Sequence, residues 1–143
     1  MKKIISIALI LAFAGAITCN AQRSTTNGAS FIKKFYLNLV LTDYSDSQEA
    51  YYSKHLTARM NKLLQDEYGY ECDGVCYAWW MFRIGGNDAD IDSQRRSIKV
   101  TPASGGWYNV RLTDNGVTKT VKVKLIAKNR TFYLDRVNNP EWQ

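Results

Sequence analysis

The stretch that decides the fold is SIKVTPASGGWYNVRLTDNGVTKTVKVKLIAKNRTFYLDRV, residues 97–137. Apolar and polar residues alternate along it, which is the period of strands that are buried on one side. The alternation predicts four strands. Their inward-facing residues are Ile98 and Val100; Tyr108, Val110 and Leu112; Val121, Val123 and Leu125; and Phe132 and Leu134.

Short polar turns separate these strands. They are ASGG at 103–106, DNG at 114–116 and KNR at 128–130. Such connections are too short for a crossover, so neighbouring strands must be antiparallel. Thr120, Lys122 and Lys124 alternate with the inward-facing residues and are expected to form the solvated side of the sheet.

Two apolar stripes at helical spacing precede the meander. Ser30 can cap a first helix, whose stripe is Phe31, Ile32, Phe35, Leu39 and Val40. The SDSQ sequence at 45–48 has the spacing of a capping box. It starts a second helix, which is expected to break within 53–57 and to stop near Tyr68 and Gly69, with the stripe Tyr52, Leu56, Met60, Leu63 and Leu64.

Helices followed by a meander predict an α+β fold, with two N-terminal helices packed on one face of a curved, cone-like antiparallel sheet of four to five strands. The additional strand would lie at Val75–Phe82, where both alternating faces are apolar. Such a segment is a strand buried on both sides or a short buried helix. The strand is the favoured interpretation.

The N-terminus has the order of a secretory signal peptide: Lys2 and Lys3, an apolar run from Ile4 to Ile17, then TCNAQ. The run is shorter than the ~20 apolar residues of a membrane span. Cleavage after Ala21 predicts a signal peptide at 1–21, a flexible leader at 22–29 and a single domain at 30–143. The protein is then bacterial and exported, periplasmic or secreted. The alternative is a lipoprotein anchored through Cys19, and only that case predicts membrane contact.

Charge is mild. The chain has 19 basic and 13 acidic residues, a net charge of +6, and loss of Lys2 and Lys3 with the signal peptide leaves +4. An exported protein whose basic residues are spread along the sequence is not expected to bind nucleic acid. The domain is large enough to bury one core without a metal, and no cofactor is predicted.

Cys72 and Cys76 remain after cleavage, and an oxidising compartment favours a disulfide between them. Asp73 and Gly74 supply the turn that such a small ring needs. Three residues separate the cysteines instead of the two of a thioredoxin-type pair. This spacing does not favour redox chemistry, so a thiol redox protein that uses Cys72 and Cys76 is only the third functional hypothesis.

Candidate metal ligands and general bases are few. Asp88, Asp90 and Asp92 alternate as at the start of a calcium loop, but Ser93 and Lys99 stand where that loop needs Gly and Glu, so a polar turn is expected and no metal is predicted. His55 is the single histidine. No sequence signature of the common enzyme classes occurs, which leaves His55 and Asp90 as the candidate bases of an enzyme.

The aromatic residues Tyr77, Trp79, Trp80 and Phe82 are the candidate ligand-binding residues. Pockets are lined mainly by apolar and aromatic side chains with a few polar groups. The same residues could equally belong to the core, which is where large apolar side chains are most often found. Both interpretations stay open from sequence.

The chain also resembles a known group of proteins over residues 31–137. The resemblance rests on FIKKFYLNLV, YYSKHLTARMNKLL, DADID, SIKV, WYNVRL, KTVKVKLIAK and RTFYLDRV. These segments resemble small exported bacterial proteins known as a domain of unknown function, similar in architecture to the nuclear transport factor 2-like, cystatin-like cone. The resemblance implies a curved sheet wrapped over helices, often with a pocket, and no agreed functional residues. QDEYG at 65–69 lacks the valine of the Gln-x-Val-x-Gly hairpin of cystatin inhibitors, so protease inhibition loses its motif.

These observations favour a non-enzymatic exported binding module. It would hold a small apolar ligand or an envelope protein, as an inhibitor or an immunity-type protein does. A cone-fold lyase, isomerase or hydrolase is the alternative. The sequence predicts no particular oligomeric state.

Overall fold

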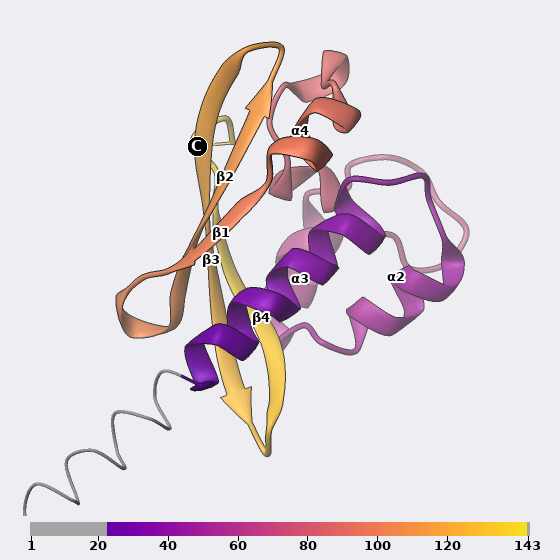
Figure 1. Ribbon diagram of the computed structural model, residues 1–143. Coiled ribbons are helices and arrows are strands. Elements are labelled where there is room, and N and C mark those ends of the chain that lie inside the picture. The colour runs from indigo at the N-terminus through magenta and orange to yellow at the C-terminus, as the bar shows by residue number, and fades with distance from the viewer. Residues whose placement is uncertain (1–22, 143) are drawn as a thin grey trace, which may run out of the picture.

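The computed structural model describes residues 23–142, which form an α+β fold (Figure 1). Its sheet has the order β1-β2-β3-β4 with every neighbouring pair antiparallel. The strands are β1 (Lys99–Pro102), β2 (Trp107–Asp114), β3 (Val117–Lys128) and β4 (Thr131–Asn138). The predicted four-stranded meander is confirmed, because the alternation buries one face of each long strand and leaves the other exposed.

The turns form where the sequence predicts them. Asn115 and Gly116 have φ values of 47° and 80°, and Asn129 and Arg130 have φ values of 51° and 63°. Asn and Gly tolerate this left-handed region, so hairpins of two residues can close there. The β1–β2 connection contains the short helix η4 (Ser104–Gly106).

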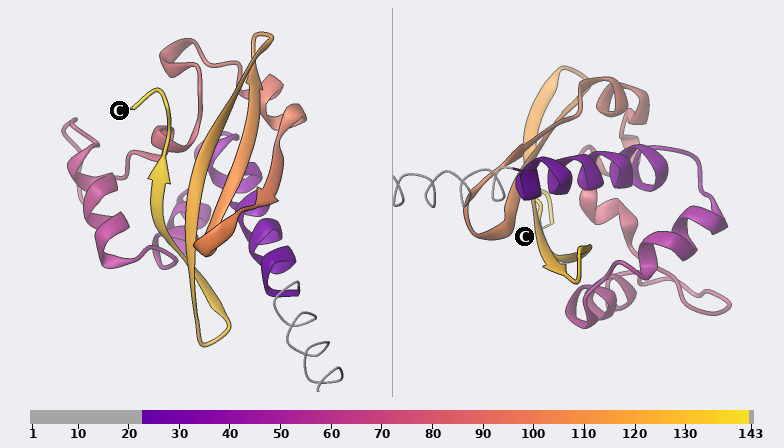
Figure 2. Two further views of the ribbon diagram at one scale, coloured as in Figure 1. Left: turned by 90° about the vertical axis from the view of Figure 1, so that its left-hand side faces the viewer. Right: turned by 60° about the horizontal axis from the view of Figure 1, so that its bottom comes forward.

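A bulge bends the last hairpin. Lys124 pairs with Arg136 and Leu125 pairs with Leu134, so Asp135 is the additional residue of β4. Bulges of this kind increase the twist of the strands that carry them. The sheet curves as a result, and the helices cover only one of its faces (Figure 2).

The first helix covers residues 23–35 and continues as a π-helical turn, η1 (Tyr36–Val40). It begins earlier than the sequence predicts: Ser30 lies inside it, and residues 23–29, the predicted flexible leader, are helical. Gly28 packs so closely on Tyr108 that a Cβ atom there would collide with the hydroxyl group. The contact between Gly28 and Tyr108 holds the polar N-terminal part of this helix against β2. Residues 1–21, the predicted signal peptide, lie outside the described residues.

The second predicted helix is interrupted at the predicted place, giving α2 (Asp46–Ser53) and α3 (Ala58–Asp66). Ser45 is the N-cap residue of α2 as expected, although its hydroxyl group does not bond to the helix backbone. Between the helices, Thr57 N donates to Leu134 O at 3.0 Å and Leu134 N donates to His55 O at 2.7 Å. The residues of the break therefore satisfy the backbone N–H and C=O groups of Leu134 at the outer edge of β4.

Two predictions for the middle of the chain are wrong. Residues 75–78 have no regular structure and Trp79–Phe82 form a 3₁₀ turn, η2, so the additional strand is absent from the described chain. The alternative interpretation, a short buried helix, fits Trp79–Phe82, because a short run with apolar residues on both faces suits a buried helical turn as well as a strand. The polar turn predicted after Gly86 is instead η3 (Gly86–Asp88) followed by a helix, α4 (Ile91–Ser97).

The core lies between the helices and the covered face of the sheet. Phe35 is at its centre, with edge-to-face ring contacts at 4.9 Å to Phe82, 5.2 Å to Tyr52 and 5.5 Å to Tyr36. The sheet contributes Tyr108, Val110, Leu112, Val121, Val123, Leu125 and Leu134, all buried. Side chains of both layers thus fill this space. Across residues 23–142, no helix combines the length and apolar character needed to span a bilayer.

Candidate functional site

Two adjoining surface depressions meet at the η2 segment. The first has a volume of about 530 Å³ and the second about 570 Å³. Tyr68, Trp80 and Arg83 line both, so these residues form the wall between them. We call the pair the aromatic depressions.

The walls are aromatic on both sides. The Trp80 ring lies 5.4 Å from that of Tyr68 and 6.1 Å from that of Tyr70, between ring centroids. In the first depression, Tyr77 lies 5.2 Å from Trp79. Aromatic side chains provide large, stiff contact surfaces, so the depressions suit a ligand with a flat apolar face.

The polar groups of the first depression come from the end of the first helix and from α2. Glu49 Oε2 accepts a 2.8 Å hydrogen bond from Trp79 Nε1, which fixes the indole. A hydrogen bond with Asp46, followed by burial and the Glu49 charge, raises the pKa of Tyr44 to about 12. A tyrosine with its ordinary pKa is already neutral at physiological pH, so this rise leaves the protonation state of Tyr44 unchanged there.

Arg83 is the cation shared by both depressions. Its Nε atom is buried and has no hydrogen-bond acceptor among residues 23–142. A buried donor without an acceptor costs about 1–3 kcal/mol. An acceptor oxygen placed within reach of this atom would remove the cost.

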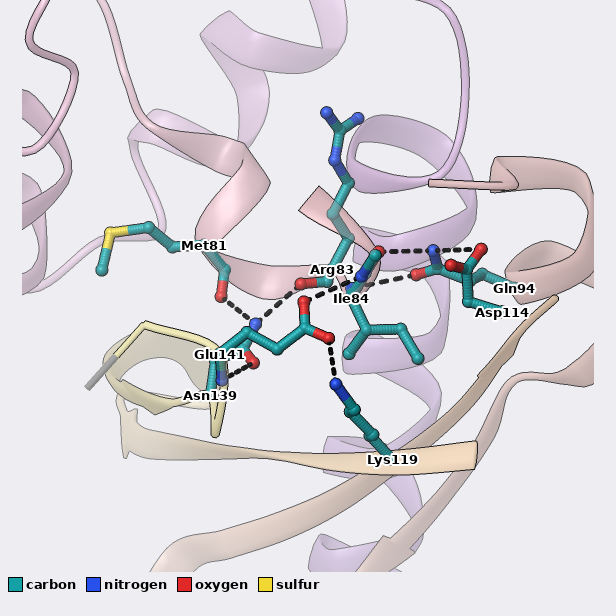
Figure 3. Close-up of polar contacts among 9 residues, drawn as sticks. Met81, Arg83, Ile84, Gln94, Asp114, Lys119, Asn139 and Glu141 are labelled. Carbon is teal, nitrogen blue, oxygen red and sulfur yellow. Dashed lines mark hydrogen bonds and ion pairs between the residues drawn. The ribbon is translucent and has the colours of Figure 1, made fainter. Parts of the chain in front are cut away.

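Side chains that bond to the backbone hold the segment with Trp80 and Arg83 (Figure 3). Asn139 Nδ2 donates to Met81 O at 2.9 Å and to Arg83 O at 2.7 Å. Glu141 accepts from Gly85 N at 2.8 Å and pairs with Lys119 Nζ at 2.5 Å. The C-terminal residues thereby clamp the segment to the sheet.

A second clamp comes from α4. Gln94 is fully buried, and its amide accepts from Ile84 N at 3.2 Å and donates to Ile84 O at 2.7 Å. Figure 3 shows the Arg83 guanidinium pointing away from all of these contacts. The backbone is therefore fixed while the cation remains directed away from the clamp.

The four predicted ligand-binding aromatics divide into two groups. Tyr77 and Trp80 line the depressions, and Trp79 borders the first depression while packing in the core, 5.9 Å from the Phe35 ring. Phe82 is 0% exposed and belongs to the core. Residues of a 3₁₀ turn point in several directions, so a continuous aromatic run serves both purposes.

His55 has a structural position. A carbonyl oxygen can only accept, so His55 Nδ1 donates to Phe132 O at 2.8 Å. Its ring packs on Tyr51 at 4.7 Å and Phe31 at 5.3 Å. The imidazole thus secures the break between α2 and α3 to β4.

Asp90 lies at the other end of the sheet. It is the N-cap residue of α4 and accepts from Ser93 N at 2.9 Å, while its own N–H donates to Asp114. Asp114 pairs with Val117, whereas Phe132 beside His55 pairs with Ala127. Ten residues of β3 correspond to roughly 30 Å. His55 and Asp90 therefore do not converge on one catalytic centre.

The three alternate acids do not form a metal centre. Asp90 caps α4 and Asp92 lies in its first turn, while Asp88 ends η3. The described part of the chain contains no group of three or more His, Cys, Asp or Glu residues that could hold a metal ion.

Cys72 and Cys76 form the predicted disulfide. It closes a small ring at the exposed end of the loop after α3, and Cys76 also reaches the first aromatic depression. The bond is thus located to constrain the loop that leads to the aromatic wall.

Replacing both cysteines by serine is expected to lower the free energy of unfolding by no more than about 2 kcal/mol, because so small a ring restricts the unfolded chain little. Urea denaturation measures the change, and the reduced wild-type protein is the matched control. A loss as large as that of a core truncation would contradict this local role.

Sequence reasoning missed Tyr68, Arg83 and Trp142. The sequence predicts Tyr68 only as the end of the second helix, and Arg83 follows the aromatic run without any motif. Trp142 joins the second depression from the opposite end of the chain. No sequence signal brings these positions together, because the contacts depend on the clamp by Asn139 and Glu141.

The fold and the depressions together define a small α+β protein with helices on one face of an antiparallel meander and an aromatic surface site. No family model and no curated protein matches the chain. It is similar to the crystal structure, at 2.10 Å resolution, of a protein of unknown function from Bacteroides thetaiotaomicron VPI-5482. The TM-score is 0.59 at 14% identity, over 88% of this chain and 99% of the other. This likeness shows the fold alone.

Proposed function

We propose that the protein is a non-enzymatic binding protein whose aromatic depressions hold a small ligand. One observation carries the proposal: Trp80 and Arg83 are half-buried at the junction of two depressions, and no described residue supplies an acceptor to the buried Arg83 Nε. The ligand would present a flat apolar face to Trp80 and an oxygen to Arg83. This refines the small apolar ligand predicted from sequence.

The rigidity of the site supports this proposal. The backbone of residues 81–85 accepts hydrogen bonds from Asn139 and Gln94 and donates hydrogen bonds to Glu141 and Gln94, so the backbone that carries Arg83 is held in place before a ligand arrives. Pre-organised sites lose less conformational entropy on binding. The enzyme hypothesis has no comparable support, since its two candidate bases lie at opposite ends of the sheet.

We also propose that the protein is exported and works outside the cytoplasm. The Cys72–Cys76 disulfide supports this location, because such bonds persist in oxidising compartments. Membership of the nuclear transport factor 2-like cone is part of the same proposal. It is supported by the curved antiparallel sheet with helices on one face.

A screen of small aromatic and heterocyclic compounds, followed through the tryptophan indole signals in NMR spectra, tests the ligand site. We expect hits to shift the Trp80 indole signal. Trp80→Ala and Arg83→Gln should each weaken binding at least about tenfold, about 1.4 kcal/mol.

The matched controls are Tyr51→Ala and Arg96→Gln, which remove an exposed aromatic and an exposed cation outside the depressions. Both should leave affinity unchanged. Hits that bind Trp80→Ala and Arg83→Gln as tightly as the wild type would refute this site.

A protein partner is the second candidate, and the rim of the second depression favours it. Tyr70 is 75% exposed and Trp142 is 45% exposed. Exposed aromatics of this kind are enriched at the energetic centres of protein interfaces. Capture of an envelope protein by the wild type but not by Tyr70→Ser would support a partner; equal capture by both would exclude this rim.

A further inference from the structure

Basic residues gather on the uncovered face of the sheet. The four strands contain seven basic residues, Lys99, Arg111, Lys119, Lys122, Lys124, Lys128 and Arg136. Lys119 lies on the covered side, in register with buried Leu112 and paired with Glu141. The two acidic residues of the strands, Asp114 and Asp135, are both buried. The charge spread evenly along the sequence is therefore concentrated by the fold, and Figure 2 (left) shows no helix in front of this face.

Five of these cations form a continuous stripe. Arg111 and Lys122 alternate with buried neighbours, which places them on the uncovered face. Strand register places the other three cations on the same face, because Lys99 pairs with Arg111 and Lys124 pairs with Arg136. The basic stripe is Lys99, Arg111, Lys122, Lys124 and Arg136.

The stripe crosses the sheet diagonally. Arg111 pairs with Thr120, two residues before Lys122 on β3, and Lys124 lies two residues further along. With strands about 4.8 Å apart and a rise of about 3.4 Å per residue, successive Cα positions are roughly 5–8 Å apart over about 20 Å. Such a line of charge matches a linear polyanion better than a single small anion.

The arrangement is unfavourable without an anion. Lys99 faces Arg111 directly, and like charges at opposed positions destabilise a sheet. Among the described residues, no carboxylate lies within 4.0 Å of Lys99, Arg111 or Lys122, whereas Arg136 has a loose pair with Asp135 at 3.6 Å. Lys124 Nζ lies 5.9 Å from the centroid of the Trp107 ring.

The neighbouring side chains distinguish among polyanions. Single-stranded nucleic acids need aromatic rings on which bases stack. The aromatic ring within the stripe, Trp107, already has Lys124 over it. The other neighbours, Thr101, Asn109 and Thr120, carry hydroxyl and amide groups that suit sugar hydroxyls.

We propose that the basic stripe binds an acidic polysaccharide, a linear chain whose sugars carry carboxylate or sulfate groups. The polymer would lie diagonally across β1 to β4. The stripe shares no residue with the aromatic depressions, although Arg136 at its β4 end borders a further depression that Trp142 also lines.

The test is binding of the purified protein to fluorescent heparin and alginate, with neutral dextran and single-stranded DNA compared at equal salt. Binding of both acidic polysaccharides but not dextran is expected. Affinity should fall steeply with salt, because each neutralised charge releases counterions. DNA binding as tight as polysaccharide binding would overturn the choice of occupant.

Arg111→Glu is the variant that best separates a loss of polysaccharide binding from a loss of stability. It removes the repulsion with Lys99, so the thermal midpoint should stay unchanged or rise, while affinity for heparin should fall about tenfold or more. Lys33→Glu, with the same charge change on the exposed side of the first helix, should change affinity by less than about twofold. Equal weakening by both variants would show non-specific attraction and overturn the stripe.

Discussion

Replacing Phe82 by alanine is expected to lower the free energy of unfolding by about 3–5 kcal/mol. Phe82 is completely buried, and its ring lies 4.9 Å from Phe35 and 6.3 Å from Tyr36. Truncation would leave a cavity between the first helix and η2 that rigid neighbours cannot fill. Urea denaturation measures the loss.

Trp80→Ala is the matched comparison, two positions away on the same 3₁₀ turn. Trp80 is only half-buried, so its truncation should cost clearly less stability while removing ligand binding. A Trp80 variant less stable than the Phe82 variant would contradict the division between core and ligand wall.

Gly85→Ala is expected to destabilise the protein by about 3 kcal/mol or more. Gly85 has φ = 87°, and a Cβ atom there would collide with the Asp114 carboxylate and approach Ala89 Cα to 2.9 Å. To relieve this collision, the backbone around Gly85 would have to move, although hydrogen bonds to Glu141 and Gln94 hold it. Thermal and urea denaturation would both report the change.

Gly86→Ala separates the energetic cost of a steric collision from the cost of a left-handed backbone conformation. Gly86 also has a positive φ, 55°, but a Cβ atom would meet nothing within 4 Å. Its expected cost is only about 1 kcal/mol, from the left-handed conformation. Similar losses for the two variants would show that close packing around Gly85 is unimportant.

The meander was predictable because local chemistry and burial agree there. Alternation, asparagine and glycine turns and short connections all require the same antiparallel hairpins. The break between α2 and α3 was also expected at residues 53–57, although the apolar stripe of Tyr52, Leu56 and Met60 keeps its spacing across it. In the structure Thr57 caps α3 at this place, because its hydroxyl group accepts a 3.3 Å hydrogen bond from Met60 N.

Other elements depend on contacts that no local pattern encodes. Helix α4 has little apolar stripe and is fixed through Gln94, whose amide bonds to Ile84. The early start of the first helix depends on Gly28 against Tyr108. In each case a residue distant in sequence decides the local structure.

The two candidate sites show the same dependence. The aromatic run at 77–82 was visible in sequence, but the division between Phe82 and Trp80 follows from the turn that replaced the expected strand. Lys122 and Lys124 were correctly expected opposite the buried residues of β3. The stripe they form with Lys99 and Arg136 depends on strand register, which spacing along one strand does not contain.

The most direct test of the central claim is a native mass spectrum of the protein isolated from its own cells, beside Trp80→Ala and Tyr51→Ala. A ligand held in the aromatic depressions predicts a defined non-covalent adduct on the wild type and Tyr51→Ala that is absent from Trp80→Ala. An adduct that persists on Trp80→Ala, or bare protein in all three spectra, would contradict the claim.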